Sequence, residues 1–265
     1  MRRGIWGDRG AARLFHILVL LCWVSLGALP VAAQQPAPQP TLPVQPAEMA
    51  PPAPTLIAVF GDSQAQGLAM GLQRVLVEDP RYKVLNRTHP GAALVHAENE
   101  WLGPVERFAA REQADIAVVM FGANDRLDLR ESGAYLRFRT DEWRSAYAAR
   151  ADRILDALSK TGMRIVWCGN PIARSETYST DMSYINDIFA EEAARYGAQF
   201  VPLWSVITDE QGHFTAYGKD RGGTTQRMRT DDGIHFTSPG YELIAEKIVT
   251  LLSSTAANTS AAAPH

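Results

Sequence analysis

Apolar residues follow two alternating patterns between residues 55 and 253 of the chain. Short unbroken runs rich in valine and isoleucine are typical of strands buried on both faces of a parallel sheet. Longer segments with apolar residues three to four positions apart are typical of helices that cover such a sheet. Strands are expected at 56–60, 83–86, 116–121, 164–168 and 199–202, and helices at 65–77, 98–112, 143–160, 183–196 and 238–252. This alternation predicts an α/β fold, a three-layer αβα sandwich with a mainly parallel five-stranded sheet.

The N-terminal part of the chain has a different composition. Residues 1–33 combine an arginine-rich start with an apolar run that ends at the small residues Ala32 and Ala33, as in a cleavable export signal. The run is also close to the roughly 20 residues that span a bilayer, so an uncleaved anchor stays open. Residues 34–54 are rich in proline, which favours an extended linker.

These features divide the chain into four parts. The sequence predicts a signal peptide or N-terminal anchor at 1–33, a proline-rich linker at 34–54, one folded domain at 55–253 and a flexible tail at 254–265. The predicted location is the periplasm or cell envelope, with a membrane tether only through the N-terminal segment.

Removal of the signal would leave an acidic domain. After residue 33 the chain has 22 lysines and arginines against 28 aspartates and glutamates, a balance that excludes a large basic surface for nucleic acid. Cys168 would be the remaining cysteine, at the end of a buried strand, so no disulfide within the domain is expected. The histidine and cysteine spacing suggests no metal site, and no cofactor is expected.

Three short polar stretches carry candidate chemistry. They are Gly-Asp-Ser-Gln at 61–64, Gly-Ala-Asn-Asp at 122–125 and Asp-Gly-Ile-His at 232–235. The first two follow predicted strands directly, so Ser63 and Asn124 are expected at the same edge of the sheet. A serine becomes a good nucleophile when a histidine takes its proton and a carboxylate orients that histidine. The sequence therefore predicts a catalytic set of Ser63, His235 and Asp232.

Each of these residues also has an ordinary structural interpretation. Ser63 could cap the helix that follows it, and Asn124 could close a turn. Asp232 and His235 could form a surface ion pair. Asp231 is a rival carboxylate, four positions from the histidine instead of three, and His89 and His96 are rival bases.

On these residues the chain resembles the SGNH (GDSL-type) hydrolases. Residues 61–64 match the first block of that family, with Gln64 where leucine is commoner, and residues 122–125 and 232–235 match its third and fifth blocks. Gly91 matches the glycine of the second block. The resemblance spans residues 55–252 and implies the family's fold with a flavodoxin-like strand order.

The resemblance also implies a role for each matched residue. Ser63 would attack an ester carbonyl, His235 would pass the serine proton to the leaving alcohol, and Asp232 would orient His235. The oxyanion would receive hydrogen bonds from the backbone amides of Ser63 and Gly91 and from the Asn124 side chain. Asp62 and Asp125 are expected to hold their loops by accepting backbone amides, and Gln64 and Arg126 are candidate substrate contacts.

The expected function is a serine ester hydrolase that works through an acyl-serine intermediate. Export and the range of the family suggest a carbohydrate O-acetyl esterase of the cell envelope, with an acylated glycan or another ester as its partner. A lipid or thioester hydrolase, an O-acyltransferase and a non-catalytic glycan-binding module stay open. Residues 126–142 are either a solvated insertion or a lid that binds an anionic glycan. Several aromatic residues could stack on sugar rings or belong to the core: Trp101, Tyr135, Trp143 and Trp204.

Overall fold

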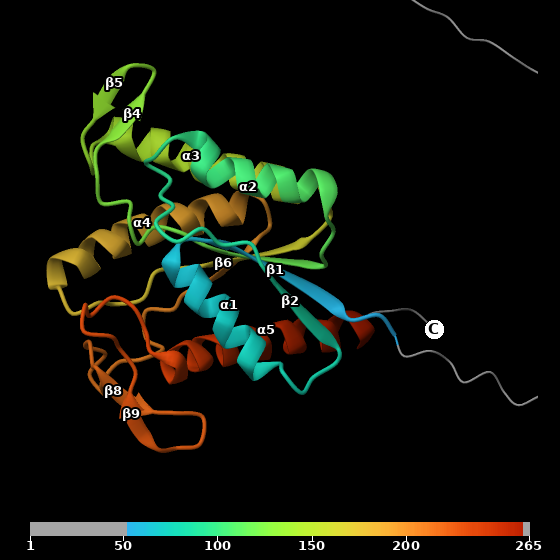
Figure 1. Cartoon of the computed structure of the whole chain (residues 1–265). Helices are drawn as coiled ribbons and strands as arrows, with labels where there is room; N and C mark the ends of the chain where they lie inside the picture. The colour runs from blue at the N-terminus through green and yellow to red at the C-terminus, as the bar shows by residue number, and fades with distance from the viewer. Residues whose placement is uncertain (1–51, 262–265) are drawn as a thin grey trace, which may run out of the picture. The chain divides into compact units, whose positions relative to one another are not determined.

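Five parallel strands form the central sheet of the structure, a computed structural model that describes residues 52–261. In space they follow the order β2 (Tyr82–Asn86), β1 (Thr55–Gly61), β3 (Ile116–Met120), β6 (Arg164–Cys168) and β7 (Gln199–Val201). Every residue of the middle strand β3 is buried, which explains its unbroken apolar sequence. The predicted parallel sheet and its flavodoxin-like order are confirmed (Figure 1).

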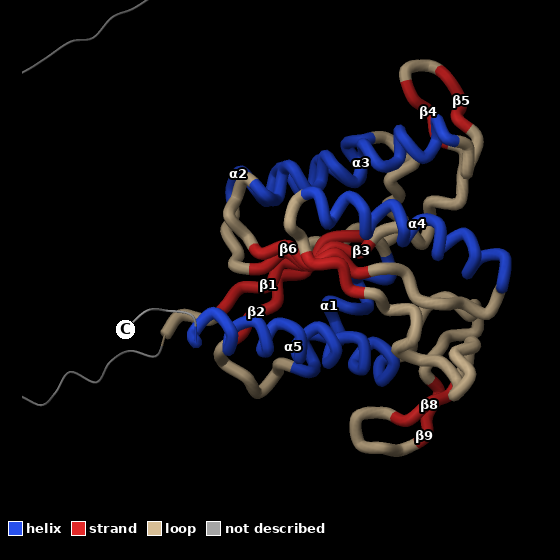
Figure 2. The backbone as a smooth tube through the Cα atoms, turned by 180° about the vertical axis from the view of Figure 1, so that it is seen from behind, coloured by secondary structure: helices blue, strands red, loops and turns tan. Residues whose placement is uncertain are grey.

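Helices cover both faces of this sheet, which confirms the predicted three layers. On one face lie α2 (Glu98–Arg111), α3 (Asp141–Ser159) and α4 (Glu176–Arg195), and on the other lie α1 (Ser63–Val75) and α5 (Ser238–Ala261) (Figures 1 and 2). Each helical layer covers its own apolar cluster. Trp101 and Trp143 are buried in the first cluster, so they belong to the core and not to a sugar-binding surface.

Close packing joins α1 to α5. A Cβ atom on Gly67 would lie 1.9 Å from the ring of Tyr241, and a Cβ atom on Gly71 would lie 2.5 Å from the Tyr241 carbonyl oxygen. The absence of side chains at these two positions lets the Tyr241 ring lie directly on α1. Its hydroxyl then reaches the start of α1 and donates a hydrogen bond to Gln64 Oε1 at 3.0 Å.

Helices α4 and α5 extend beyond their predicted bounds. α4 begins at Glu176 instead of residue 183, because the Ser175 side chain caps it by accepting a hydrogen bond from the Tyr178 amide at 3.2 Å. α5 continues to Ala261, so much of the segment predicted to be a flexible tail is helical. Alanine, the residue with the highest helix propensity, is frequent there, and the next proline is residue 264.

Within the described residues, two short antiparallel hairpins were not predicted. β4 (Leu129–Glu131) pairs with β5 (Ala134–Leu136), and β8 (Tyr217–Lys219) pairs with β9 (Thr225–Arg227). The first hairpin lies in the 126–142 stretch. Leu129 is fully buried, and the Trp143 indole donates a hydrogen bond to the Leu127 carbonyl at 2.9 Å. This stretch is therefore a hairpin anchored to the domain at its base.

The predicted signal peptide or anchor at 1–33 and the linker up to residue 51 lie outside the described residues. Between residues 52 and 261, no helix has the length and apolar character needed to cross a membrane.

Candidate active site

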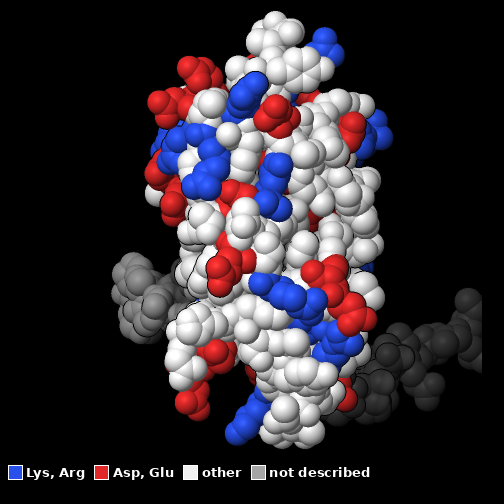
Figure 3. Space-filling view, turned by 90° about the vertical axis from the view of Figure 1, so that its left-hand side faces the viewer, with Lys and Arg blue, Asp and Glu red and all other residues white. Residues whose placement is uncertain are grey.

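The predicted site residues come together at the carboxyl-terminal edge of the sheet, which we call the rim. β1 ends at Gly61 and β3 ends at Met120, so Ser63 and Asn124 both follow strand ends. The loop that carries Asp232 and His235 precedes α5 and returns to the same edge. Figure 3 looks onto this side of the molecule, where basic and acidic side chains are interspersed above and below the middle of the face.

The residue that caps α1 is Asp62, not Ser63. The Asp62 side chain accepts a hydrogen bond from the Gln64 amide at 2.8 Å, and Ser63 is the first residue of the helix. The structural interpretation of Ser63 as a cap is therefore wrong. The amide of Ser63 belongs to the first helical turn, where amides have no carbonyl partner within the helix and can bind an anion.

Ser63, His235 and Asp232 form a continuous hydrogen-bonded chain. Ser63 Oγ lies 2.7 Å from His235 Nε2, and His235 Nδ1 lies 2.7 Å from Asp232 Oδ2. Their order along this chain is nucleophile, base and orienting carboxylate, which is the geometry required to activate a serine.

The side chains of the rival residues lie outside this hydrogen-bonded chain. Asp231 pairs with Arg227, and its side chain is 91% exposed. His96 lies 3.3 Å from Glu100, and His89 is exposed on the loop after β2. The three-residue spacing therefore correctly predicted that Asp232 is the carboxylate in contact with His235.

Several donors surround the Asp232 carboxylate. Partial burial by itself would raise the pKa of Asp232, but hydrogen bonds from Thr230, the Ile234 and His235 amides and the His235 ring outweigh it and hold the pKa well below its usual range. Oδ1 accepts from Thr230 Oγ1 at 2.7 Å and from the Ile234 amide at 2.8 Å. Asp232 is thus ionised at neutral pH and can stabilise a charged histidine.

The proposed oxyanion donors Asn124 and Gly91 lie in adjoining loops. Asn124 Nδ2 donates a hydrogen bond to the carbonyl of Ala92, the residue after Gly91, at 3.0 Å. A side-chain amide has two N–H bonds, so one remains for an oxyanion. Gly91 has a φ of +83°, which favours glycine, although a Cβ there would meet no described atom within 4 Å. Backbone conformation, not space, therefore requires glycine at this position.

Asp62 and Asp125 hold these loops from below. Asp62 Oδ2 accepts a hydrogen bond from the Ala123 amide at 3.2 Å, while Asp125 accepts from the Val95 amide at 3.1 Å and from the Tyr147 hydroxyl at 2.7 Å. Both carboxyl groups are fully buried. Burial raises the pKa of Asp62 to about 7 and that of Asp125 to about 6, against the opposing effect of these donors.

The expectation that Gln64 contacts substrate is wrong. Its side chain is 1% exposed, and both ends of the amide are bonded inside the protein. Nε2 donates to the Ile234 carbonyl at 2.9 Å, and Oε1 accepts from the Tyr241 hydroxyl. Gln64 therefore positions the segment that carries His235.

Arg229 has a related role that sequence reasoning missed. It is fully buried and donates from Nη1 to the Ile234 carbonyl at 3.1 Å and from Nη2 to the Ile172 carbonyl at 2.6 Å. Burial lowers the pKa of Arg229 to about 9, and the nearby Asp232 opposes that shift, so the guanidinium is charged at neutral pH. An arginine between a methionine and a threonine gives no periodic signal, so the sequence could not mark it as buried.

Arg126 lies beside the Asn124 loop but is already paired. Its Nε donates to Asp181 Oδ2 at 2.7 Å, and its guanidinium lies 4.9 Å from the centre of the Tyr178 ring. Arg139 from the base of the β4–β5 hairpin shares the same carboxylate at 3.1 Å. The Tyr178 hydroxyl donates to the Ala123 carbonyl at 2.9 Å, so this group of residues supports the asparagine loop.

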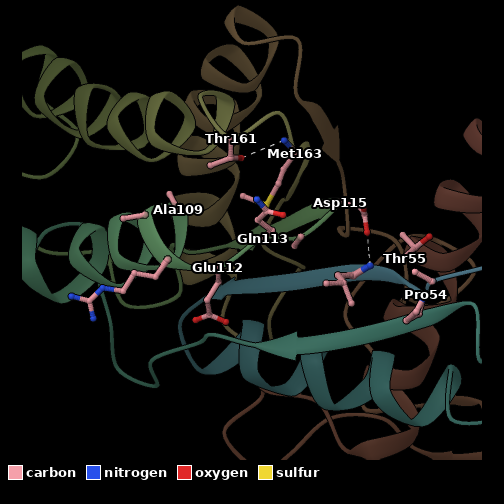
Figure 4. Close-up of a pocket in the computed structure, with 13 residues that line it drawn as sticks. Pro54, Thr55, Ala109, Glu112, Gln113, Asp115, Thr161 and Met163 are labelled. Atoms are coloured by element: carbon pink, nitrogen blue, oxygen red, sulfur yellow. Dashed lines mark hydrogen bonds between the residues drawn. The ribbon is translucent and has the colours of Figure 1, made fainter.

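A cavity of about 830 Å³ lies at the opposite edge of the sheet (Figure 4). It is lined near the amino ends of the strands by Thr55, Asp115 and Met163, and Asp115 accepts a hydrogen bond from the Leu56 amide at 2.7 Å. None of the predicted site residues lines it. Among residues 52–261, no cluster of histidine, cysteine and acidic side chains is arranged to hold a metal ion.

The chain matches a known protein family over most of its folded domain. A family model described as "Protein of unknown function (DUF459)" matches residues 56–251. The chain belongs to this family. DUF459 is an SGNH-hydrolase-like family, so the resemblance seen in the sequence motifs is confirmed. No curated protein sequence matches this DUF459 chain.

Solved structures of low identity share the fold of the DUF459 domain. LAE5, an alpha/beta hydrolase enzyme from the metagenome of Lake Arreo, is 16% identical with a TM-score of 0.54, over 75% of this chain and 94% of that one. TesA is 18% identical with a TM-score of 0.52, over 75% and 98% of the two chains. A mutant of Axe2, an acetyl-xylooligosaccharide esterase from Geobacillus, is 11% identical with a TM-score of 0.50, over 75% and 94%. These likenesses show the fold.

The buried carboxyl groups predict how stability depends on pH. Between the unfolded pKa of 3.8 and the folded pKa of about 7, the folded protein keeps a proton on Asp62 that the unfolded chain has lost. The free energy of unfolding should therefore fall as pH rises through this window, with a slope of at most about 1.4 kcal/mol per pH unit from one group.

Asp62→Asn should make this pH dependence shallower, because asparagine cannot ionise and is an equally good helix cap. Urea unfolding between pH 4 and 7 would measure the slope for wild type and variant. The exposed Asp187→Asn, which removes one carboxylate from the surface, is the matched control. Equal slopes for wild type and Asp62→Asn would show that Asp62 is ionised in the folded protein throughout.

Proposed function

We propose that this protein is a serine ester hydrolase that works through an acyl-serine intermediate. The observation that carries the proposal is the hydrogen-bonded chain from Ser63 Oγ through the His235 ring to Asp232, with both distances 2.7 Å. The oxyanion donors lie in the loops next to this chain, so nucleophile, base and electrostatic stabiliser share one edge of the sheet.

The mechanism follows from these positions. Ser63 Oγ attacks the ester carbonyl carbon while His235 Nε2 takes its proton. The carbonyl oxygen becomes an oxyanion that accepts hydrogen bonds from the amides of Ser63 and Gly91 and from Asn124. When the intermediate collapses, the alcohol leaves with the proton from Nε2, and the acyl group stays on Ser63. Water then repeats the cycle with His235 as base and frees the acid.

The substrate class we propose is an O-acetylated carbohydrate of the cell envelope. Two features support it: the export-like N-terminal sequence, and a fold shared with Axe2, an acetyl-xylooligosaccharide esterase. We also propose that the reaction takes place in the periplasm or at the cell envelope, because the N-terminal sequence resembles an export signal. An acetyl group is small, so specificity would come mainly from contacts with the sugar.

Substitution of the two neighbouring aspartates tests the mechanism. Asp232→Asn should lower kcat for an aryl acetate by about 10⁴-fold, because the histidine loses the acceptor that fixes its tautomer. Asp231→Asn is the matched control, since Asp231 pairs with Arg227 and should leave kcat near that of wild type. A larger loss for Asp231→Asn, or full activity in Asp232→Asn, would contradict the assignment.

The role of Gln64 gives a second test. Gln64→Leu removes a donor to the Ile234 carbonyl and should lower kcat by about 10- to 100-fold through misplacement of His235. Tyr241→Phe removes the other partner of Gln64 but keeps the bond to Ile234, so its kcat should stay close to that of wild type. Steady-state kinetics on folded protein, checked by thermal unfolding, distinguish the two. Wild-type turnover in Gln64→Leu would show that Arg229 suffices to hold the loop.

A further inference from the structure

A second cavity, of about 680 Å³, lies beside the loop that carries Asp232 and His235. One wall is a face of α4, and the other is formed by Trp204 and Phe214, which follow β7. Figure 1 shows the start of α4 above the orange loops after β7, on the side of the molecule where the strands end. The volume lies within the range of about 300–1,000 Å³ that is usual for small-molecule sites.

The walls of this cavity combine aromatic rings with hydrogen-bonding groups. Glu176, Thr180 and Ser183 are spaced by four and three residues, so they share one exposed face of α4. On the opposite wall, the half-buried Trp204 packs against the core, which limits movement of its ring. Phe214 is also half-buried, and the guanidinium of Arg174 lies 5.6 Å from the centre of its ring.

This combination suits a sugar. The C–H face of a sugar ring is apolar and can lie on an aromatic ring, while its hydroxyl groups can donate to a carboxylate and exchange hydrogen bonds with threonine and serine. The Thr180 hydroxyl donates to the Glu176 carbonyl at 3.0 Å and can still accept a hydrogen bond from a sugar. A purely aliphatic group would desolvate the Glu176 carboxylate without giving it a partner, which costs binding energy.

Arg174 connects the cavity to the proposed catalytic loop. Its side chain lines the cavity, its amide donates to the Gly233 carbonyl at 3.0 Å, and its Nη1 donates to the Asp231 carbonyl at 2.7 Å. The cavity wall is therefore in direct contact with the segment between Asp231 and His235.

The positions of the base and the oxyanion donors determine how an ester would lie in the site, with its alcohol part toward the cavity. The leaving oxygen must come within hydrogen-bond reach of His235 Nε2 to receive its proton, while the carbonyl oxygen points to the donors at Gly91 and Asn124. The alcohol part thus extends from Ser63 toward the histidine loop, and the cavity adjoins that loop.

We propose that this cavity is the subsite that binds the sugar carrying the acyl group. The proposal rests on the proposed ester hydrolase function for its orientation, but binding of the sugar is independent of catalysis. It identifies Trp204, Thr180 and Glu176 as specificity-determining residues.

Binding is tested first, in protein that cannot turn over. Ser63→Ala is titrated by calorimetry with short acetylated xylo-, cello- and chito-oligosaccharides. Thr180→Trp, added to Ser63→Ala, fills the cavity from an exposed helical position and should weaken binding by at least about tenfold. Ala194→Trp is the matched control, because it puts the same ring at an exposed position near the other end of α4, about 21 Å along the helix from Thr180 and outside the cavity.

Kinetics with intact Ser63 give the second readout. Thr180→Trp should lower the ratio of kcat/KM for the acetylated oligosaccharide to kcat/KM for a small aryl acetate by at least about tenfold, and Ala194→Trp should leave this ratio unchanged. Trp204→Ala should change the ratio in the same direction as Thr180→Trp.

The outcomes separate the two proposals. Absence of oligosaccharide binding to Ser63→Ala, or equal binding by the Thr180→Trp and Ala194→Trp variants, would overturn the sugar subsite. Selective slowing of a long-chain acyl ester by Thr180→Trp would also overturn it, because the cavity would then hold the acyl group. Another outcome is a wild type that cleaves no ester, while Ser63→Ala binds the oligosaccharide and Thr180→Trp abolishes that binding. This result would refute the hydrolase function but support the sugar site.

Discussion

The hydrogen bonds to the Ile234 carbonyl oxygen fix the distance between nucleophile and base. Gln64 donates to this oxygen from α1 at 2.9 Å, and Arg229 donates to it from beneath the loop at 3.1 Å. Ser63 and Gln64 are consecutive, and so are Ile234 and His235. A bond between Gln64 and Ile234 therefore joins the two segments next to the point where Ser63 Oγ meets His235 Nε2. Loss of this contact would free the histidine loop at the point where small displacements affect the rate most.

Other packing in the domain supports this contact. Tyr241 can reach Gln64 because Gly67 leaves room for its ring on α1, so the packing of α5 on α1 also orients the Gln64 amide. Arg229 is a buried cation whose Nε has no hydrogen-bond partner among the described residues. Its guanidinium lies 3.7 Å from the centre of the Phe236 ring, which offsets part of the cost of burying the charge.

The sequence was enough to predict the sheet, its helical layers and the residues that meet at the rim. Buried parallel strands have a strong pattern, and the ends of such strands lie at one edge of the sheet. The three-residue spacing correctly distinguished Asp232 from Asp231 as the partner of His235, because one turn of chain brings that carboxylate to the ring. Contacts between distant segments could not be predicted in this way. Gln64 was expected to face substrate because it follows Ser63, and its burial depends on Tyr241, 177 positions later. The hairpins were missed because three-residue strands are too short to show a period.

Covalent labelling would show whether Ser63 is an activated nucleophile. Folded wild-type protein would be treated with a fluorophosphonate, digested and analysed by mass spectrometry, with Ser63→Ala as the control. One adduct is expected on the peptide that contains Ser63, and none on that peptide in the variant, because His235 lies 2.7 Å from the Ser63 hydroxyl and can take its proton. An adduct on another residue, or cleavage of an aryl acetate by Ser63→Ala at the wild-type rate, would contradict this role of Ser63.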